Sequence, residues 1–193
     1  MSETRRRIEL TALQDDPRGV NPTFDEIRRT RGDVSNLFRL IAVCPPALEP
    51  FFALSKFVRD DSELPARLRE IAILVTATTF DVRYEIAAHT VAGRQAGLTD
   101  DEIQALKAAN WTDFSVIEQA VIRYASEVAL RRDAADETIA ALLTQFSERQ
   151  VVELAVIVAW YHLVAAIVQP LRLELDPELD TESTRNRGAH ARG

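Results

Sequence analysis

The sequence contains a single cysteine, Cys44, among its 193 residues. One cysteine cannot form a disulfide within the chain, so a secreted fold held together by disulfides is excluded. Redox chemistry by a pair of thiols within one chain is excluded for the same reason. The start of the chain is charged and lacks the apolar stretch of a signal peptide. We therefore expect a cytoplasmic protein.

Glycine and proline are also scarce, with six and eight residues, and no segment shows the pattern of a strand pair or a hairpin turn. Alanine, leucine, glutamate and arginine are abundant, and these residues favour helices. Hydrophobic residues make up 47% of the chain and charged residues 27%, which is typical of a soluble globular protein. The composition therefore predicts an all-α fold.

An excess of positive charge and a long apolar run are missing as well. The formal net charge is −7, and the arginines are mostly scattered along the chain, so we expect no nucleic-acid partner. The longest apolar run, residues 154–168, is shorter than the roughly 20 residues of a membrane-spanning helix. It also contains His162. We interpret this run as a buried helix with His162 as a core residue, and we expect no membrane partner.

Apolar periodicity and helix-end signals divide the chain into helices. Asp81 is expected to cap one of them, and Gly97 to end it in a left-handed conformation. Two capping boxes, at residues 99–102 and 147–150, mark the starts of later helices, and Pro170 is expected to end the last. The expected helices lie within residues 21–31, on either side of Pro45-Pro46 in residues 33–60, and over about residues 65–79, 82–96, 100–109, 114–130, 133–146 and 148–169.

Both ends of the chain are polar, whereas the apolar pattern is continuous between them. We expect a polar N-terminal arm over residues 1–20 and one helical domain over residues 21–176. Residues 177–193 are expected to form a disordered tail, because they contain too few apolar residues to join a core.

Glu85 lies four positions before His89, a spacing that places the two side chains on the same face of a helix. Glu85 can then hydrogen-bond one ring nitrogen of His89 and leave the other nitrogen free to exchange a proton. Such a pair suits acid–base chemistry. The plainer interpretation is a surface pair, and for Glu70 it is a surface salt bridge. We expect no metal, because no nearby histidine or cysteine completes a ligand set.

The segment LREIAILVTATTFDVRYEIAAHTVAGRQAGLTDDEIQAL, residues 68–106, resembles the core of the carboxymuconolactone decarboxylase family, which includes the AhpD-like alkylhydroperoxidases. The likeness extends over about residues 30–176. The positions that match the family pattern are Arg67, Glu70, Tyr84, Glu85, His89 and the turn at residues 97–99.

One departure from the peroxidase branch of that family concerns its thiols. That branch resembles Glu-x11-Cys-x-x-Cys-x-x-x-His, and here Val82 and Glu85 occupy the two cysteine positions. A thiolate is the nucleophile that reduces a peroxide, so thiol peroxidase activity is not expected. Glu85 in place of a cysteine instead resembles the decarboxylase branch.

The resemblance implies an AhpD-like helical bundle that assembles into a homo-oligomeric ring, commonly a trimer or a hexamer. It also implies a cofactor-free lyase that removes carbon dioxide from a small lactone acid in aromatic catabolism. His89 would deliver the proton, Glu85 would orient it, and Glu70 would act from the preceding helix as a second proton relay or orienting group.

The acidic small-molecule substrate would need a cationic partner and a pocket. Arg69 or Arg83 could bind its carboxylate through two hydrogen bonds. Tyr84 could line the pocket, although packing is its plainer role. Two alternatives stay open: an isomerase, hydratase or lactone-opening hydrolase that uses the same site, and a helical oligomeric binding protein without turnover.

Overall fold

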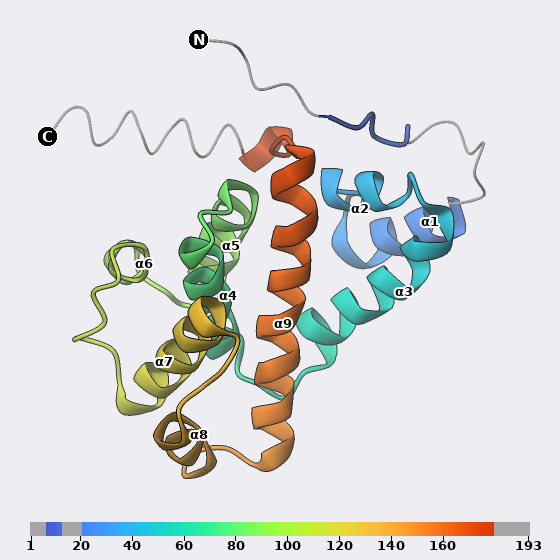
Figure 1. Ribbon diagram of the computed structural model, residues 1–193. Coiled ribbons are helices and arrows are strands. Elements are labelled where there is room, and N and C mark those ends of the chain that lie inside the picture. The colour runs from blue at the N-terminus through green and yellow to red at the C-terminus, as the bar shows by residue number, and fades with distance from the viewer. Residues whose placement is uncertain (1–6, 13–20, 180–193) are drawn as a thin grey trace, which may run out of the picture. The chain divides into compact units, whose positions relative to one another are not determined.

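The computed structural model describes residues 7–12 and 21–179 (Figure 1). Every regular element in these ranges is a helix, which confirms the predicted all-α fold. By its internal contacts the chain divides into two compact units, residues 1–60 with 168–193, and residues 61–167. The two units are described separately below.

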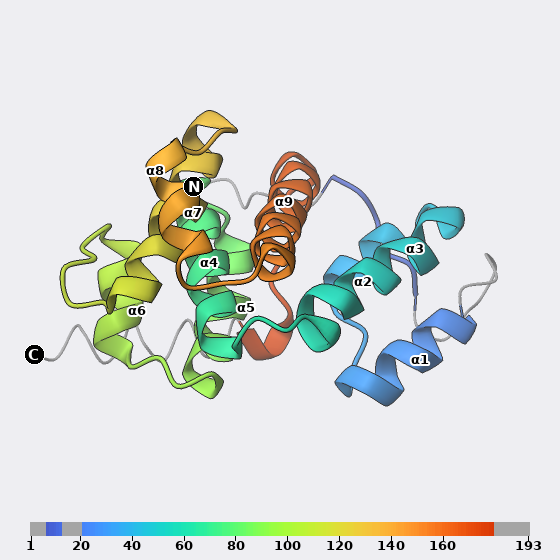
Figure 2. The same cartoon turned by 90° about the horizontal axis from the view of Figure 1, so that it is seen from below.

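The first unit is built around aromatic contacts between short helices. Its helices are α1 (Asn21–Arg31), α2 (Asn36–Ile41) and α3 (Pro45–Lys56), which is followed by a π-helical turn at Phe57–Asp61. α3 contacts both α1 and α2 (Figure 2). The ring of Phe38 lies edge-on to Phe51 and Phe52, with ring centroids 6.1 and 5.7 Å away. The expected break at Pro45-Pro46 is confirmed, because both prolines lie in the first turn of α3.

Both polar ends of the chain contribute ordered segments to this unit. The backbone N–H of Arg7 donates to the carbonyl of Leu171. The backbone N–H of Asn36 donates to Asp176 at 2.7 Å, and its side-chain amide donates to the carbonyls of residues 174 and 175. Residues 177–179 are helical. The rest of the expected arm and tail, residues 1–6, 13–20 and 180–193, lies outside the described residues.

The second unit surrounds α4, which is buried on nearly every side. The helices of this unit are α4 (Ala66–Thr79), α5 (Arg83–Gln95), α6 (Asp100–Lys107), α7 (Val116–Arg131), α8 (Asp136–Leu143) and most of α9 (Glu148–Leu171). α4 contacts α5, α6 and α7 (Figure 1). Residues 70–77 of α4 are all buried, as expected for a helix whose surface is covered all round. Glu70 is the one carboxylate in this buried stretch.

The connection between α4 and α5 departs from the expected cap. Val82, and not Asp81, is the N-cap residue of α5, and Asp81 has a left-handed backbone with φ 53°. The chain reverses direction within residues 80–82, and aspartate is one of the few residues with a β-carbon that tolerate this conformation. The expected end of α5 is confirmed, because Gly97 has φ 89°.

The other helix ends mostly follow the sequence signals. The capping boxes at Thr99 and Ser147 are formed, and a further one at Ser115, which the sequence reading did not identify, opens α7. α6 and α8 are a few residues shorter than expected. α9 passes through Pro170 to Leu171, because the last turn of a helix tolerates a proline better than its interior does.

Gly93 of α5 lies against Leu98, just beyond the end of the helix. A β-carbon on Gly93 would lie 3.1 Å from Leu98 Cδ1 and 3.4 Å from Leu74 Cδ1. The contact with Leu98 would be tight and the contact with Leu74 of α4 an ordinary one. A side chain at this position would therefore press mainly on Leu98.

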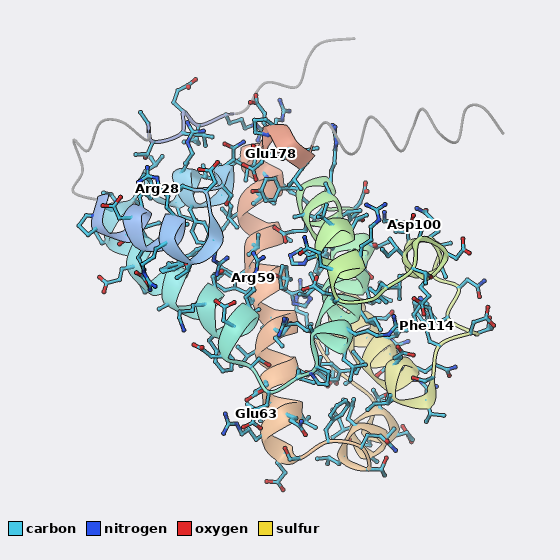
Figure 3. The ribbon with its side chains drawn as sticks, turned by 180° about the vertical axis from the view of Figure 1, so that it is seen from behind. Arg28, Arg59, Glu63, Asp100, Phe114 and Glu178 are labelled. Atoms are coloured by element: carbon cyan, nitrogen blue, oxygen red, sulfur yellow. The ribbon has the colours of Figure 1, made fainter. Side chains whose placement is uncertain are left out.

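Glu153 ties α9 to the segment that precedes α4. Its carboxylate is buried, and it accepts hydrogen bonds from the backbone N–H of Glu63 at 2.7 Å, from Ser62 Oγ at 3.0 Å and from Arg149 Nε at 3.0 Å. Glu63 lies beside the start of α9 (Figure 3), where Arg149 Nη1 is 3.2 Å from its carboxylate. By length and composition alone α9 could span a membrane, although half of its most apolar stretch is buried inside the protein.

Arg67 joins the first turn of α4 to the starts of α6 and α7. Its guanidinium donates to the carbonyl of Gly97 at 2.7 Å, to Glu118 at 2.7 Å and to Glu102. The two glutamates are the acidic partners of the Thr99 and Ser115 capping boxes. The hydrogen bond from Arg67 is the main cause that lowers the pKa of Glu102 to about 2.

We expect that Arg67→Gln destabilises the protein at pH 7 by about 1–3 kcal/mol, because it removes hydrogen bonds to two partly buried carboxylates. The pKa of Glu102 is lower in the folded protein, so its stabilisation is present above pH 4.5 and is lost as the pH falls toward 2. Urea unfolding should therefore show a smaller difference between Arg67→Gln and the parent at pH 3 than at pH 7.

The matched control is Arg29→Gln, which removes an exposed pair with Glu26 on α1 and should change little. Equal losses of stability in the two variants would contradict the role given to Arg67.

Candidate active site

Three side chains from α4 and α5 meet within the second unit. His89 Nδ1 lies 2.6 Å from Glu70 Oε2, and His89 Nε2 lies 3.3 Å from Glu85 Oε2. The short connection at residues 80–82 makes the two helices neighbours, so Glu70 of α4 can reach His89 of α5. The structure thus brings together the three residues that the sequence proposed for acid–base chemistry.

The cluster is almost withdrawn from water. Glu70 and Glu85 are 5% and 3% exposed, whereas the side chain of His89 is 15% exposed. A carboxylate buried to this degree is stable in its ionised form only beside a cation or several hydrogen-bond donors. The surface interpretation of Glu70 is therefore wrong, and so is that of the Glu85–His89 pair.

The two carboxylates determine the charge of His89. Burial alone lowers the pKa of His89, because it disfavours the imidazolium. The charge of Glu70 and its hydrogen bond, followed by those of Glu85, outweigh burial and raise the pKa of His89 to about 9. At neutral pH the ring is therefore an imidazolium that presents one N–H to each carboxylate.

This arrangement corrects one expectation about His89. The helix spacing predicted that Glu85 orients the ring and that the other nitrogen stays free. Instead both nitrogens face carboxylates, and the shorter contact is made by Glu70. The spacing on α5 alone could not show this, because Glu70 lies on another helix. Glu85 Oε1 is shielded from solvent and has no hydrogen-bond partner among the described residues.

The two candidate arginines lie differently with respect to this cluster. Arg69 Nε is 4.0 Å from Glu70 Oε1, and its side chain is 13% exposed. This nitrogen is shielded and has no hydrogen-bond partner in the described part of the chain. Arg83 is exposed in the first turn of α5, two positions before Glu85, and residues so spaced point to different sides of a helix. Of the two arginines, Arg69 is the one with a described contact to the cluster.

Tyr84 is 6% exposed, in keeping with a packing role. No group of three or more histidine, cysteine, aspartate or glutamate side chains suited to a metal ion occurs among residues 7–12 and 21–179. Glu70 and Glu85 cannot share one ion with a single nitrogen of His89, because they face opposite nitrogens of its ring.

One residue of the site escaped the sequence analysis. The ring of Tyr161, from α9, lies edge-on to His89, with centroids 4.8 Å apart and an angle of 87° between the rings. The sequence showed Tyr161 only as one aromatic residue in an apolar helix, and nothing in that pattern pointed to His89.

His162 makes a different ring contact from His89, and Cys44 belongs to the other compact unit. The ring of His162 lies edge-on to Phe80 at 4.7 Å. Burial lowers the pKa of His162, with a further contribution from the charge of Arg132. His162 Nε2 is shielded from solvent and has no hydrogen-bond partner among the described residues. His162 was expected to be a core residue with its hydrogen bonds satisfied, and this nitrogen departs from that expectation. Cys44 is exposed at the start of α3.

Comparison with known proteins identifies a family that this part of the chain resembles. Residues 45–127, which include all three members of the cluster, match the model of the Carboxymuconolactone decarboxylase family. The match confirms the resemblance identified from residues 68–106, and α9 with Tyr161 lies outside it. No curated protein matches the sequence.

Solved structures of similar fold are AhpD-like proteins of low sequence identity. An uncharacterized peroxidase-related protein from Silicibacter sp. TM1040 is 16% identical with a TM-score of 0.79, covering 92% of this chain and 95% of that one. A second, an uncharacterized peroxidase-related protein with an alkylhydroperoxidase AhpD core from Ralstonia eutropha JMP134, is 19% identical with a TM-score of 0.79. The likeness covers 92% of this chain and 96% of that one.

The debrominase Bmp8, as a cysteine-to-alanine variant in complex with 2,3,4-tribromopyrrole, is 14% identical with a TM-score of 0.78. The likeness covers 94% of this chain and 99% of that one. At such identities these proteins show the fold, and they confirm the expected AhpD-like helical architecture.

The charge of His89 can be measured directly by NMR titration of the histidine rings. We expect His89 to titrate near pH 9 and His162 below pH 6.5. Glu70→Gln should move the pKa of His89 down toward 6.5, because it removes the nearest negative charge. The folded pKa of His89 lies above its ordinary value, so its protonation stabilises the fold below pH 6.5, and this stabilisation is lost as the pH rises through 9.

Single histidine-to-glutamine variants assign the three ring signals, and His162→Gln should leave the titration of His89 unchanged. A parent protein in which His89 titrates at or below pH 6.5 would contradict this account of the site.

Proposed function

We propose that this protein is a cofactor-free lyase that decarboxylates a small lactone or keto acid by acid–base chemistry. The observation that carries the proposal is the position of His89 between the buried carboxylates of Glu70 and Glu85. The family match of residues 45–127 supports it, because the name of that family describes such a reaction.

The proposed reaction requires a proton at carbon. The bond between the substrate and its carboxylate breaks, carbon dioxide leaves, and the electron pair moves into a conjugated carbonyl as an enolate. His89 then donates a proton to the carbon. Nε2 is the proposed donor, because its 3.3 Å contact with Glu85 is weaker than the 2.6 Å contact that holds Nδ1 to Glu70. A proton from solvent restores the imidazolium, with Glu85 as the relay.

Arg69 is the proposed partner of the substrate carboxylate. Its guanidinium carries a permanent charge, and its shielded Nε lacks a hydrogen-bond partner within the described residues. Arg69 also lies on the Glu70 side of His89, through the 4.0 Å contact with Glu70 Oε1. A substrate whose carboxylate is held there would have to extend past the ring, so that its reacting carbon reaches Nε2 on the Glu85 side.

Two positions that are cysteines in the peroxidase pattern hold other residues here, and this disfavours thiol chemistry. Val82 and Glu85 are 1% and 3% exposed, and neither can form a thiolate. The one cysteine, Cys44, belongs to the other compact unit. We therefore do not extend peroxidase activity, or the activity of the structurally similar debrominase, to this chain.

We also propose a cytoplasmic location and assembly into a homo-oligomer, a trimer or a hexamer. Large apolar side chains are exposed on the described surface, among them Val116 at 77% and Val152 at 62%. Such side chains are candidates for contacts between subunits. Sedimentation equilibrium should give a mass of three or six chains, and a monomer at micromolar concentration would contradict the proposal.

A screen of small lactone and keto acids, with carbon dioxide release as the readout, tests the reaction. We expect His89→Gln, Glu70→Gln and Glu85→Gln each to lower kcat by about 10²–10⁴-fold, the usual contribution of an acid–base group. The rate of the parent should fall as the pH rises through about 9, because His89 loses its proton there. In Glu70→Gln the rate should begin to fall at a lower pH than in the parent, because the pKa of His89 is lower in that variant.

The matched control is Asp101→Asn, which changes an exposed carboxylate on α6 and should leave kcat and the fold unchanged. In the same assay Arg69→Ala should raise KM more than Arg83→Ala does. Consumption of substrate without carbon dioxide would point to an isomerase, hydratase or lactone-opening hydrolase. Full activity in all three cluster variants would overturn the acid–base proposal.

A further inference from the structure

Tyr161 meets the imidazole of His89 from a helix that supplies no other residue of the cluster. Their rings lie 4.8 Å apart at 87°, and Tyr161 is 8% exposed. We propose that Tyr161 is a positioning residue that holds the His89 ring so that Nε2 stays directed at Glu85. The inference concerns the site of the proposed function, but its test needs no substrate.

The need for such a residue follows from the unequal contacts of His89. The 2.6 Å contact at Nδ1 holds one side of the imidazole firmly, whereas the 3.3 Å contact at Nε2 restrains the other side weakly. Rotation of the ring about its bond to the β-carbon would draw both nitrogens away from their carboxylates, and at Nε2 only the weaker contact resists it. An aromatic ring packed against it at nearly a right angle opposes that rotation.

A flat ring is suited to this role. The planes of the Tyr161 and His89 rings are nearly perpendicular, so the two rings are packed in a T-shaped arrangement. A leucine or methionine at this position would fill the space without a rigid flat ring, and it would leave the ring of His89 freer to turn.

The position of Tyr161 is set by the face of α9 on which it lies. Glu153, Ile157 and Tyr161 follow one another at intervals of four along one side of the helix, and all three are buried. Glu153 is bound by the backbone and side chain of residues 62 and 63, just before α4 begins. The same side of α9 is therefore anchored near the start of α4 and reaches His89 two turns later.

The family pattern does not assign this role. The residues that match the family model end at 127, before α9 begins. A plain packing role for Tyr161 is the competing explanation, and it predicts that any apolar residue of suitable size preserves the properties of His89.

The test is the pKa of His89, measured by NMR in Tyr161→Phe, Tyr161→Leu and Tyr161→Met. We expect the phenylalanine variant to keep the pKa of the parent. The leucine and methionine variants should lower it by about half a unit to one unit, because a ring that turns away from Glu85 loses part of the charge interaction that raises its pKa. The pKa of His162 should stay the same in all variants, as a control for the fold of α9.

Two results would overturn the proposal. The first is an unchanged His89 pKa in the leucine and methionine variants, which would leave Tyr161 a packing role alone. The second is an equal shift in the phenylalanine variant, which would place the effect in the hydroxyl group. If neither aliphatic variant folds, the parent protein alone still tests the proposal. Nuclear Overhauser contacts between the rings of Tyr161 and His89 are expected, and their absence would overturn the proposal.

Discussion

The contact between Glu70 and His89 is the interaction on which this site depends. α4 is buried along residues 70–77, and an unpaired carboxylate in such a helix would be strongly destabilising. His89 lies 2.6 Å away on α5 and supplies the missing positive charge. The close approach of the two helices is therefore a condition for burying Glu70 at all. In this way one contact links the packing of the helices to the charge of the site.

A second carboxylate changes what that histidine can do. With Glu70 alone, His89 would keep one free nitrogen and could act as either acid or base. With Glu85 at the other nitrogen, the ring is held as an imidazolium, and its ordinary state is that of a proton donor. Glu85 occupies a position where the peroxidase pattern has a cysteine. The residue at this position suits the transfer of protons here, whereas a thiol would suit the transfer of electrons.

The sequence predicted much of this arrangement because much of it is local. Helix periodicity and the four-residue spacing placed Glu85 beside His89, and the family pattern added Glu70. The relative length of the two histidine contacts was not predictable, because it depends on the distance between two helices. The same holds for Tyr161, which comes from α9 and carries no sequence signal that relates it to α5. The choice between Arg69 and Arg83 required the burial of each arginine and the contact of Arg69 with Glu70, which the sequence does not show.

The central claim is that His89 carries a proton on both nitrogens at neutral pH because two buried carboxylates hold it in that state. Its most direct test is a nitrogen-15 spectrum of the histidine side chains of the intact protein at pH 7. The account predicts that the two ring nitrogens of His89 have similar shifts, as in an imidazolium, and that both are coupled to a bound hydrogen. Two widely separated shifts, which mark a neutral ring with one bare nitrogen, would contradict it.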